Sequence, residues 1–266
     1  MVRKTLLGLI GCALVALPAF ATDGPVNGTV SVGVVSSYMW NGFDRVKSFG
    51  LDEGPSVQPA VSLGVRNTGL SVDLGGSFVI NDNSELHEAT YGVKFVRPVT
   101  PVVTVGAGYT YYDNMVSEVQ GLPVDDVNGH EAWGNVELQT RVGVSPGVAV
   151  KYEKSTQDDV DAYAVVVGSL KYGMPLSGVN LGTAGVSLNW GANVIYNSGV
   201  KVGGVEVVKS GVSAVTFGVN SPVQAGNLVV TPSLNYQVST AETADGVDPD
   251  IAPDQFWATV GVAYGF

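Results

Sequence analysis

Apolar and polar residues alternate along most of this chain with a period of two. One segment, for example, sets Leu188, Trp190 and Val194 against Asn189 and Asn193. Side chains with this period lie on opposite faces of a β-strand, so each strand has one apolar and one polar face. The pattern predicts twelve strands, at residues 29–40, 55–66, 69–81, 86–97, 102–112, 130–144, 147–155, 162–173, 183–197, 210–219, 228–238 and 256–266.

The connections between these strands differ in length in a regular way. Long loops at one end of the strands and tight turns at the other are typical of bacterial outer-membrane β-barrels, in which the turns face the periplasm. The long polar connections are 41–54, 113–129, 198–209 and 239–255. The short ones are 67–68, 98–101 and 145–146, whereas 174–182 and 220–227 are longer than such turns usually are.

The first residues have the composition of a secretory signal peptide. Two basic residues precede an apolar run, and small residues precede a cut that we place after Ala21. A lipoprotein signal ending before Cys12 would have too short an apolar core, and a retained helix would need about 20 apolar residues to span the membrane. We therefore expect a signal peptide at 1–21 and one barrel domain at 22–266.

Composition narrows the class further. The chain is 45% hydrophobic, yet after Ala21 no apolar run is long enough for a transmembrane helix, whereas transmembrane strands need only about 9–11 residues. Cleavage would leave 11 basic against 24 acidic residues, a net charge of −13, which does not favour nucleic acid as a partner. Cys12 is the single cysteine, so the mature chain has no disulfide or thiolate metal site. The fold class we predict is all-β, a closed antiparallel transmembrane barrel of about 12 strands.

The last predicted strand carries a more specific signal. Phe256, Val260, Tyr264 and Phe266 fall on one face of it. The segment resembles the C-terminal strand of bacterial outer-membrane barrels, whose last aromatic residue is recognised by the barrel assembly machinery. The resemblance implies that machinery as a partner through Phe266, and outer-membrane lipids around the barrel.

The first predicted strand ends in a second recognisable segment. Residues Val35 to Phe43 have the sequence VSSYMWNGF. This resembles the Ser-x-Tyr-x-aromatic-Arg-Gly segment that opens several families of porins and other exported barrels. Here Asn41 replaces the usual arginine, so a selectivity that depends on that arginine does not carry over. The resemblance covers the first strand and the general plan of the chain.

Aromatic residues gather at the ends of the predicted strands. Aromatic girdles mark the two membrane interfaces of a barrel. We expect Tyr38, Trp40, Tyr109, Tyr111, Trp133 and Tyr196 at the outer ends of the strands, and Tyr172, Tyr264 and Phe266 at the opposite ends.

Charged residues within the strands are the candidate functional residues. A charge that faces lipid at mid-depth costs about 2–4 kcal/mol, so these residues should face the lumen. The predicted lumen-lining residues are Arg66, Asp73, Glu88, Lys94, Glu137, Arg141, Lys151, Glu153 and Lys171, of which Glu137, Arg141, Lys151 and Glu153 would form one mixed-charge patch. Such charges either sort ions and small polar solutes in a pore or form salt bridges that fill a narrow barrel. The many Gly, Ser and Asn residues on the same faces favour the pore.

Catalysis and metal binding are the alternative chemistries. His87 and His130 fall at the outer ends of strands, where each could pair with a carboxylate as an acid or base, but no serine lies in a recognisable nucleophile motif. Acidic loops could offer oxygen ligands to calcium, although none has the spacing of a known calcium loop. Their residues are Asp125, Asp126, Asp158, Asp159, Asp161, Asp245, Asp248, Asp250 and Asp254. We predict no catalytic residue, metal or cofactor.

The function that we expect is passive diffusion of ions or small polar solutes through a bacterial outer-membrane channel. A barrel with a closed lumen that acts through its loops is the alternative, and an enzyme at the rim using His87 or His130 is the third possibility. The loop at 113–129 is long enough to fold inward as a constriction or to form a binding surface.

Overall fold

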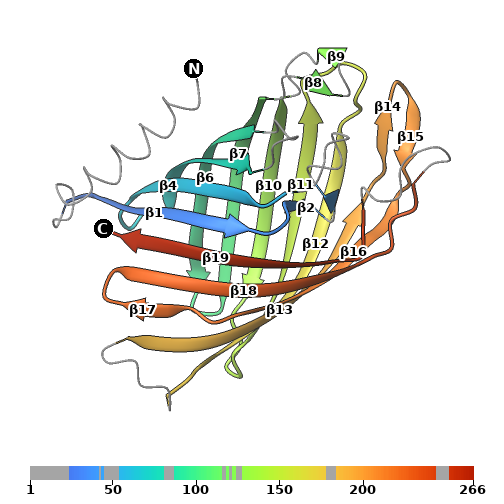
Figure 1. Ribbon diagram of the computed structural model, residues 1–266. Helices are drawn as coiled ribbons and strands as arrows, with labels where there is room; N and C mark the ends of the chain where they lie inside the picture. Colours follow the sequence, from blue (N-terminus) through green and yellow to red (C-terminus); the bar gives the residue numbers. More distant parts are fainter. Residues whose placement is uncertain are drawn as a thin grey trace.

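The computed structural model describes residues 24–41, 43–44, 54–80, 87–115, 118–119, 122–123, 128–177, 184–243 and 252–266. The predicted signal peptide lies outside these residues. Within them, no helix is long and apolar enough to cross a membrane. Most of the described chain forms β-strands (Figure 1).

Twelve strands form a closed antiparallel barrel, as the alternation predicts. They are β1 (Val26–Val35), β4 (Ser56–Val65), β5 (Leu70–Val79), β6 (His87–Thr100), β7 (Val103–Met115), β10 (Gly129–Leu138), β11 (Val144–Ser155), β12 (Tyr163–Pro175), β13 (Gly185–Asn197), β16 (Gly211–Asn220), β18 (Leu228–Ser239) and β19 (Gln255–Gly265). Each pairs with its neighbours in this order, and β1 pairs with β19 to close the ring, where Figure 1 shows them side by side. Closure satisfies the backbone hydrogen bonds that a free edge would expose.

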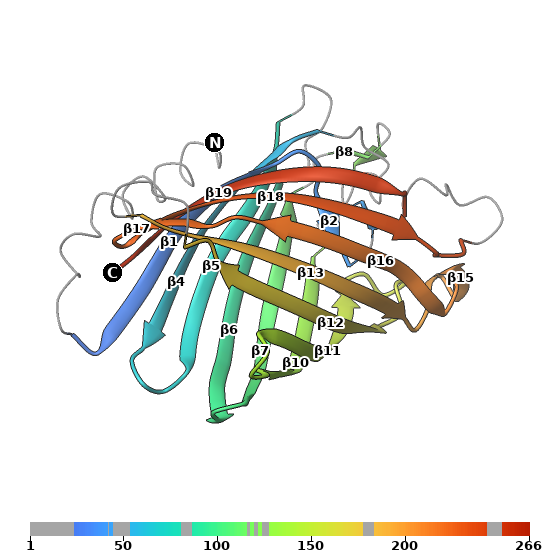
Figure 2. The ribbon, with the colours of Figure 1, turned by 90° about the horizontal axis from the view of Figure 1, so that it is seen from below.

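Seven short strands complete the described secondary structure. They are β2 (Met39–Trp40), β3 (Phe43–Asp44), β8 (Glu118–Val119), β9 (Leu122–Pro123), β14 (Val200–Val202), β15 (Val205–Val208) and β17 (Val223–Ala225). The first six pair as three hairpins within the long connections. Figure 2 shows β15 beyond the ends of the barrel strands. The long connections therefore gather at one end of the barrel, which we call the loop side.

The strand β17 explains the length of the connection at 220–227. Pro222 has no N–H to donate, so the ladder of β16 is interrupted there. β17 then pairs with β13 and β18 beyond the end of β16. Only Gly226 and Asn227 turn the chain, and Gly226 has a φ of 59°, which glycine adopts without strain. The connection is a tight turn preceded by a strand extension.

Side chains along the barrel strands alternate between two environments. Those that point outward are mostly apolar and exposed, such as Val194 (46%), Phe217 (51%) and Val260 (50%). Their neighbours along each strand are mostly Gly, Ser, Thr, Asn or charged residues, and these face the lumen. A belt of exposed apolar side chains around a closed barrel is the surface that membrane lipid covers. The predicted fold class is confirmed.

One predicted strand runs through a turn. The sequence predicts a single strand over 130–144, but β10 ends at Leu138 and β11 begins at Val144. In the turn between them, Thr140 Oγ1 donates a hydrogen bond to the carbonyl oxygen of Val144 (2.6 Å), and Gly143 has a φ of 80°. Val142 in the turn continues the alternation from Leu138 to Val144, and so the pattern does not show the turn.

Two aromatic residues that we expected in the outer girdle point inward instead. Trp133 pairs with Gly108 and Lys151 on the lumen face, and Tyr38 lies inside the loop-side end of the barrel. The expectation for both residues rests on their position near the end of a predicted strand. It does not take into account whether the residue is on the outward or the lumen face. The rings of Tyr91 and Tyr111 are 6.3 Å apart on the outward face, where the girdle is expected.

Candidate functional site in the lumen

A segment at the end of the first strand crosses the lumen at the loop side. β1 ends at Val35, five residues before the predicted end. Ser36 still contacts β19: its backbone N–H donates to the carbonyl oxygen of Ala258 (2.9 Å), and its Oγ accepts from the backbone N–H of Ala258 (3.0 Å). The chain then leaves the wall. We call residues 36–41 the crossing segment. It follows β1, and its far end reaches β11, which is six strands from β1 in either direction around the barrel.

Beyond Ser36, side-chain hydrogen bonds to three strands hold the crossing segment. Near its beginning, Gln255 Nε2 of β19 donates to Ser37 Oγ (2.8 Å). In the middle, Tyr38 Oη donates to Glu88 Oε1 of β6 (2.6 Å). At the end, Asn41 Nδ2 donates to Glu153 Oε1 of β11. The polar residues of the VSSYMWNGF segment thus contact three strands on different sides of the lumen, β19, β6 and β11.

Three carboxylates are buried around this segment. Glu88, Glu131 and Glu153 are 2%, 4% and 5% exposed. A buried carboxylate is costly unless it is hydrogen-bonded or paired with a cation. Lys151 Nζ contacts Glu131 Oε2 at 3.0 Å, and Tyr163 Oη donates to Glu153 Oε2 at 2.9 Å. The loop side of the lumen is therefore a dense polar layer dominated by acidic groups among the described residues.

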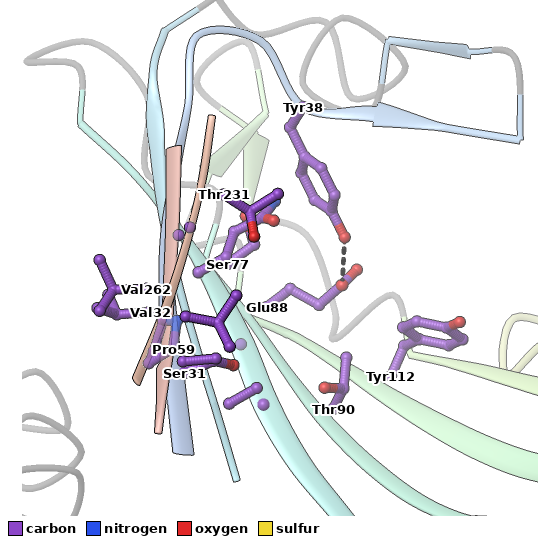
Figure 3. A pocket seen from close by; sticks show the side chains of 18 residues that line it. Ser31, Val32, Tyr38, Pro59, Ser77, Glu88, Thr90, Tyr112, Thr231 and Val262 are labelled. Carbon is purple, nitrogen blue, oxygen red and sulfur yellow. Dashed lines mark hydrogen bonds between the residues drawn. The ribbon is translucent and has the colours of Figure 1, made fainter. Parts of the chain in front are cut away.

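A cavity of about 490 Å³ lies beside the crossing segment (Figure 3). In Figure 3, Tyr38 reaches down to Glu88, and Thr90 and Tyr112 lie farther along the same wall. Ser31 and Thr231 line the cavity from the opposite side. Hydroxyl groups thus surround the carboxylate on the lumen side, as they would in a passage for polar solutes.

At several positions on the lumen face, a glycine on one strand lies directly opposite a polar or aromatic residue on the neighbouring strand. The lumen wall is thin there, because the larger side chain occupies the space above the glycine. Asn235 lies opposite Gly218, and a Cβ on that glycine would be 2.6 Å from Asn235 Oδ1. Trp133 likewise lies opposite Gly108, whose Cβ would be 2.6 Å from the indole ring. The side chains therefore lie flat across the glycines instead of projecting towards the barrel axis. Asn27–Gly64, Asn135–Gly106 and Asn189–Gly173 repeat the arrangement.

Seven of the nine predicted lumen residues occupy inward positions on strands. Asp73, Glu88, Lys94, Glu137, Lys151, Glu153 and Lys171 share the lumen face. The other two do not lie on the wall. Arg66 is the first residue after β4, and Arg141 is exposed in the turn between β10 and β11. The expected patch therefore lacks Arg141. Glu131, which the prediction missed, takes its place beside Lys151 and has the same strand parity as Glu137.

Four of the predicted charged residues form two pairs nearer the turn side. Lys94 Nζ donates to Asp73 Oδ1 at 2.9 Å, with the two side chains 38% and 31% exposed. Lys171 Nζ contacts Glu137 Oε2. Partly solvated pairs of this kind contribute at most about 1 kcal/mol to stability. These pairs therefore neutralise charge on the lumen face and add little to the stability of the barrel.

The charged residues lie on one half of the barrel. All eight described lumen charges that belong to strands (the seven above and Glu131) come from β5, β6, β10, β11 and β12. In the described part of β13, β16, β18, β19, β1 and β4, the inward positions hold Gly, Ala, Ser, Thr, Asn, Gln, Trp and apolar residues, with no charge. We call these the charged wall and the neutral wall. Val165, Ile195 and Ala214 form a small apolar cluster where the two meet.

The two histidines point away from the lumen. His87 packs against Phe78, with ring centroids 5.6 Å apart. His130 contacts the hydroxyl of Tyr109 through Nδ1 and lies 5.2 Å from the ring of Tyr111. Both belong to the aromatic surface at the loop side.

The acidic loops offer no metal site within the residues that are described. No group of three or more His, Cys, Asp or Glu residues is arranged there to hold a metal ion. Asp158, Asp159 and Asp161 are exposed, and Asp254 Oδ1 accepts a hydrogen bond from the backbone of Ser239 (2.7 Å). The remaining predicted acidic residues, Asp125, Asp126, Asp245, Asp248 and Asp250, lie outside the described chain.

Comparison with solved structures finds bacterial outer-membrane barrels. The KdgM porin aligns over 90% of this chain and 99% of its own, with a TM-score of 0.51 and 10% identity. LpxR from Salmonella typhimurium aligns over 89% and 99%, with a TM-score of 0.51 and 10% identity. The NanC porin aligns over 89% and 98%, with a TM-score of 0.50 and 10% identity. No family model matches this chain, and no curated protein matches it by sequence.

This protein has the fold of a bacterial outer-membrane β-barrel. The similarity to the three structures concerns the fold, and the exposed apolar belt is the part of this chain that the membrane requires. The strand number and the localisation predicted from the sequence are confirmed.

Proposed function

We propose that this barrel is a passive channel for ions or small polar solutes, with the crossing segment as its constriction. The observation that carries the proposal is the thin lumen wall, in which side chains lie flat over cross-strand glycines. A barrel that used its side chains to fill the interior would have no need of glycine at these positions. Hydroxyl and amide groups line the space that results, which suits solutes that carry their own hydration or hydroxyl groups.

The crossing segment gives the channel its selectivity in this proposal. Buried acidic groups surround it, with Glu88 and Glu153 both bonded to it. Rings or clusters of carboxylates at a narrow point favour cations. The channel should therefore prefer cations, and the preference should depend on the residues that touch the crossing segment. This function is also compatible with the names of two structural neighbours, the KdgM and NanC porins.

Liposome swelling tests the channel function directly. Vesicles containing refolded 22–266 are placed in iso-osmotic solutions of arabinose, glucose and raffinose, and swelling is followed by light scattering. We expect the rate to fall in that order of solute size. Vesicles with heat-unfolded protein serve as the control. Swelling no faster than in the control, with protein shown to be folded by its heat-dependent gel mobility, would contradict the proposal.

A barrel with a closed lumen is the second candidate, and the buried layer at the loop side favours it. Phe43 of β3 packs with Val208 of β15 and Ala252, so loops from three parts of the chain meet over that end. If these contacts close the mouth permanently, the liposomes will not swell, and the loops become the place to look for a partner.

A further inference from the structure

A second cavity, separate from the one beside Tyr38, lies mainly against the neutral wall and extends to β11 and β12 of the charged wall. Its volume is about 490 Å³, within the range of about 300–1,000 Å³ that is usual for ligand sites. Four asparagines line it, Asn189 and Asn193 of β13, Asn220 of β16 and Asn235 of β18. We call it the amide cavity.

The amide cavity combines hydrogen-bonding groups with a flat aromatic ring. Trp257 of β19 lines it and lies directly opposite Asn235. Gly191 and Gly218 are paired across the middle of the wall, where the absence of two side chains leaves room. An indole face offers an apolar surface of low conformational entropy beside the amides.

Donors and acceptors in this cavity are only partly used by the protein. Asn189 Nδ2 donates to Asn220 Oδ1 (2.8 Å), and Asn193 Nδ2 donates to Thr216 Oγ1 (3.0 Å). Each of these pairs leaves a further amide donor or acceptor for another partner. Within the described chain, neither the side-chain amide of Asn235 nor the indole N–H of Trp257 makes a hydrogen bond. The cavity therefore offers hydrogen-bond donors and acceptors close together. This suits a hydroxyl group, which both donates and accepts a hydrogen bond.

The charges around the cavity exclude an ionic ligand. Lys171 is the one charged residue among those that line it, and its ammonium group contacts Glu137. An anion would meet a cation that is already paired, and a cation would meet no carboxylate in the lining. Neutral solutes avoid both costs.

We propose that the amide cavity binds neutral, hydroxyl-rich solutes of the sugar type, with Trp257 stacking against the ring and the asparagine amides contacting its hydroxyls. The site lies on the lumen face, so the proposal rests on the channel function, which brings the solute to it. Because the binding groups belong to the wall and not to the crossing segment, solute binding and ionic selectivity are separate properties of the protein.

Two measurements on the full mature chain test this proposal. The first is quenching of tryptophan fluorescence by maltohexaose in lauryldimethylamine oxide, a detergent without a sugar headgroup. The second is block of the ionic current in a planar bilayer by the same sugar, compared with a polyethylene glycol of similar size and with an oligogalacturonate. We expect saturable quenching and saturable block by maltohexaose, and weaker effects of the other two.

Variants separate the site from general effects on the lumen. Trp257→Ala and Asn235→Ala should each weaken apparent affinity by about tenfold, and Trp257→Tyr should retain part of it. Trp190→Ala is the matched aromatic control, because that ring is on the outward face, 46% exposed. Asn135→Ala is the matched amide control on β10 of the charged wall.

The outcomes distinguish this proposal from the channel function. Saturable quenching with no current from folded protein would overturn the channel and support the site. Current without saturable sugar effects, or effects equal to those of polyethylene glycol, would overturn the site and leave the channel. Equal loss of affinity in Trp257→Ala and Trp190→Ala, or tighter binding of the oligogalacturonate, would also overturn the site.

Discussion

Asn41 donates a hydrogen bond to Glu153 from across the barrel. Asn41 follows β1, and Glu153 is on β11, six strands away in either direction. Asn41 has a φ of 49°, a left-handed conformation that asparagine adopts more readily than most residues. The position at which this chain departs from the porin-like segment is therefore the point where the crossing segment is fixed to the opposite wall.

Releasing the crossing segment should widen the channel. In the double variant Tyr38→Phe/Asn41→Ala, the contacts to Glu88 and Glu153 are lost while the wall is unchanged. We expect single-channel conductance to rise by about twofold, with larger current noise, because the constriction is no longer held. Tyr196→Phe is the control, since Tyr196 bonds Ser210 away from the crossing segment. Equal conductance in all three proteins would show that the segment does not limit the current.

Removing one buried carboxylate should lower the preference for cations. Glu153→Gln keeps the size of the side chain and removes its charge. The reversal potential in a salt gradient should move towards zero, because fewer negative charges act on ions at the constriction. Glu242→Gln changes a carboxylate that is 73% exposed and paired with Lys209, and it should leave the reversal potential unchanged. A shift of the same size in both variants would contradict a local constriction.

The flat packing of Trp133 should depend on the glycine beneath it. In Gly108→Ala, the new methyl group would lie 2.6 Å from the indole, so the ring must move towards the axis. We expect a loss of about 1–3 kcal/mol in stability and a smaller conductance. Gly168→Ala is the matched control, because nothing lies within 4 Å of its Cβ position. Urea unfolding in detergent would measure the difference, and two equally stable variants would refute the packing argument.

The two faces of β16 should respond differently to a positive charge. Phe217 faces lipid, and its neighbour Thr216 faces the lumen. Phe217→Arg should reduce stability in lipid vesicles by about 2–4 kcal/mol, whereas Thr216→Arg should reduce it much less. A refolding titration with urea compares them. If Thr216→Arg were the more damaging change, the assignment of the faces would be wrong.

The C-terminal aromatic residue should matter for assembly more than for the finished barrel. Phe266 exchanges two backbone hydrogen bonds with Gly28, both 2.9 Å, and these do not depend on its side chain. Phe266→Ala should therefore conduct normally after refolding in vitro but accumulate poorly in the outer membrane of cells. Phe256→Ala, at the other end of the same strand, is the control. Normal cellular levels of Phe266→Ala would remove the proposed role in recognition by the assembly machinery.

The fold followed from the sequence because lipid and lumen impose opposite chemistry on alternate residues. Each barrel strand is apolar on one face and polar on the other, and so each gives the same alternation with a period of two. In most of the connections the alternation is interrupted, which separates one strand from the next. The signal failed at residues 139–143, where Val142 in the turn extended the alternation. Periodicity alone cannot distinguish such a turn from a continuing strand.

The site was only partly predictable for a different reason. The inward positions of Glu137, Lys151 and Glu153 followed from strand parity, since a charge facing lipid is costly. The inward course of residues 36–41 did not follow, because Tyr38 and Asn41 contact strands that are distant in sequence. The sequence left open whether the loop at 113–129 forms a constriction or a binding surface, and it gave no indication that the segment after β1 crosses the lumen. Trp133 could have been assigned correctly from its parity with Glu137.

Single-channel recording of refolded 22–266 in a planar bilayer under a salt gradient shows directly whether the barrel is an open channel. The channel account predicts discrete, reproducible current steps with a reversal potential of the sign for cation preference. Step size should increase in Tyr38→Phe/Asn41→Ala, which ties the current to this lumen and not to a leak around the barrel. A silent bilayer, obtained with protein that is folded and inserted, would contradict the account.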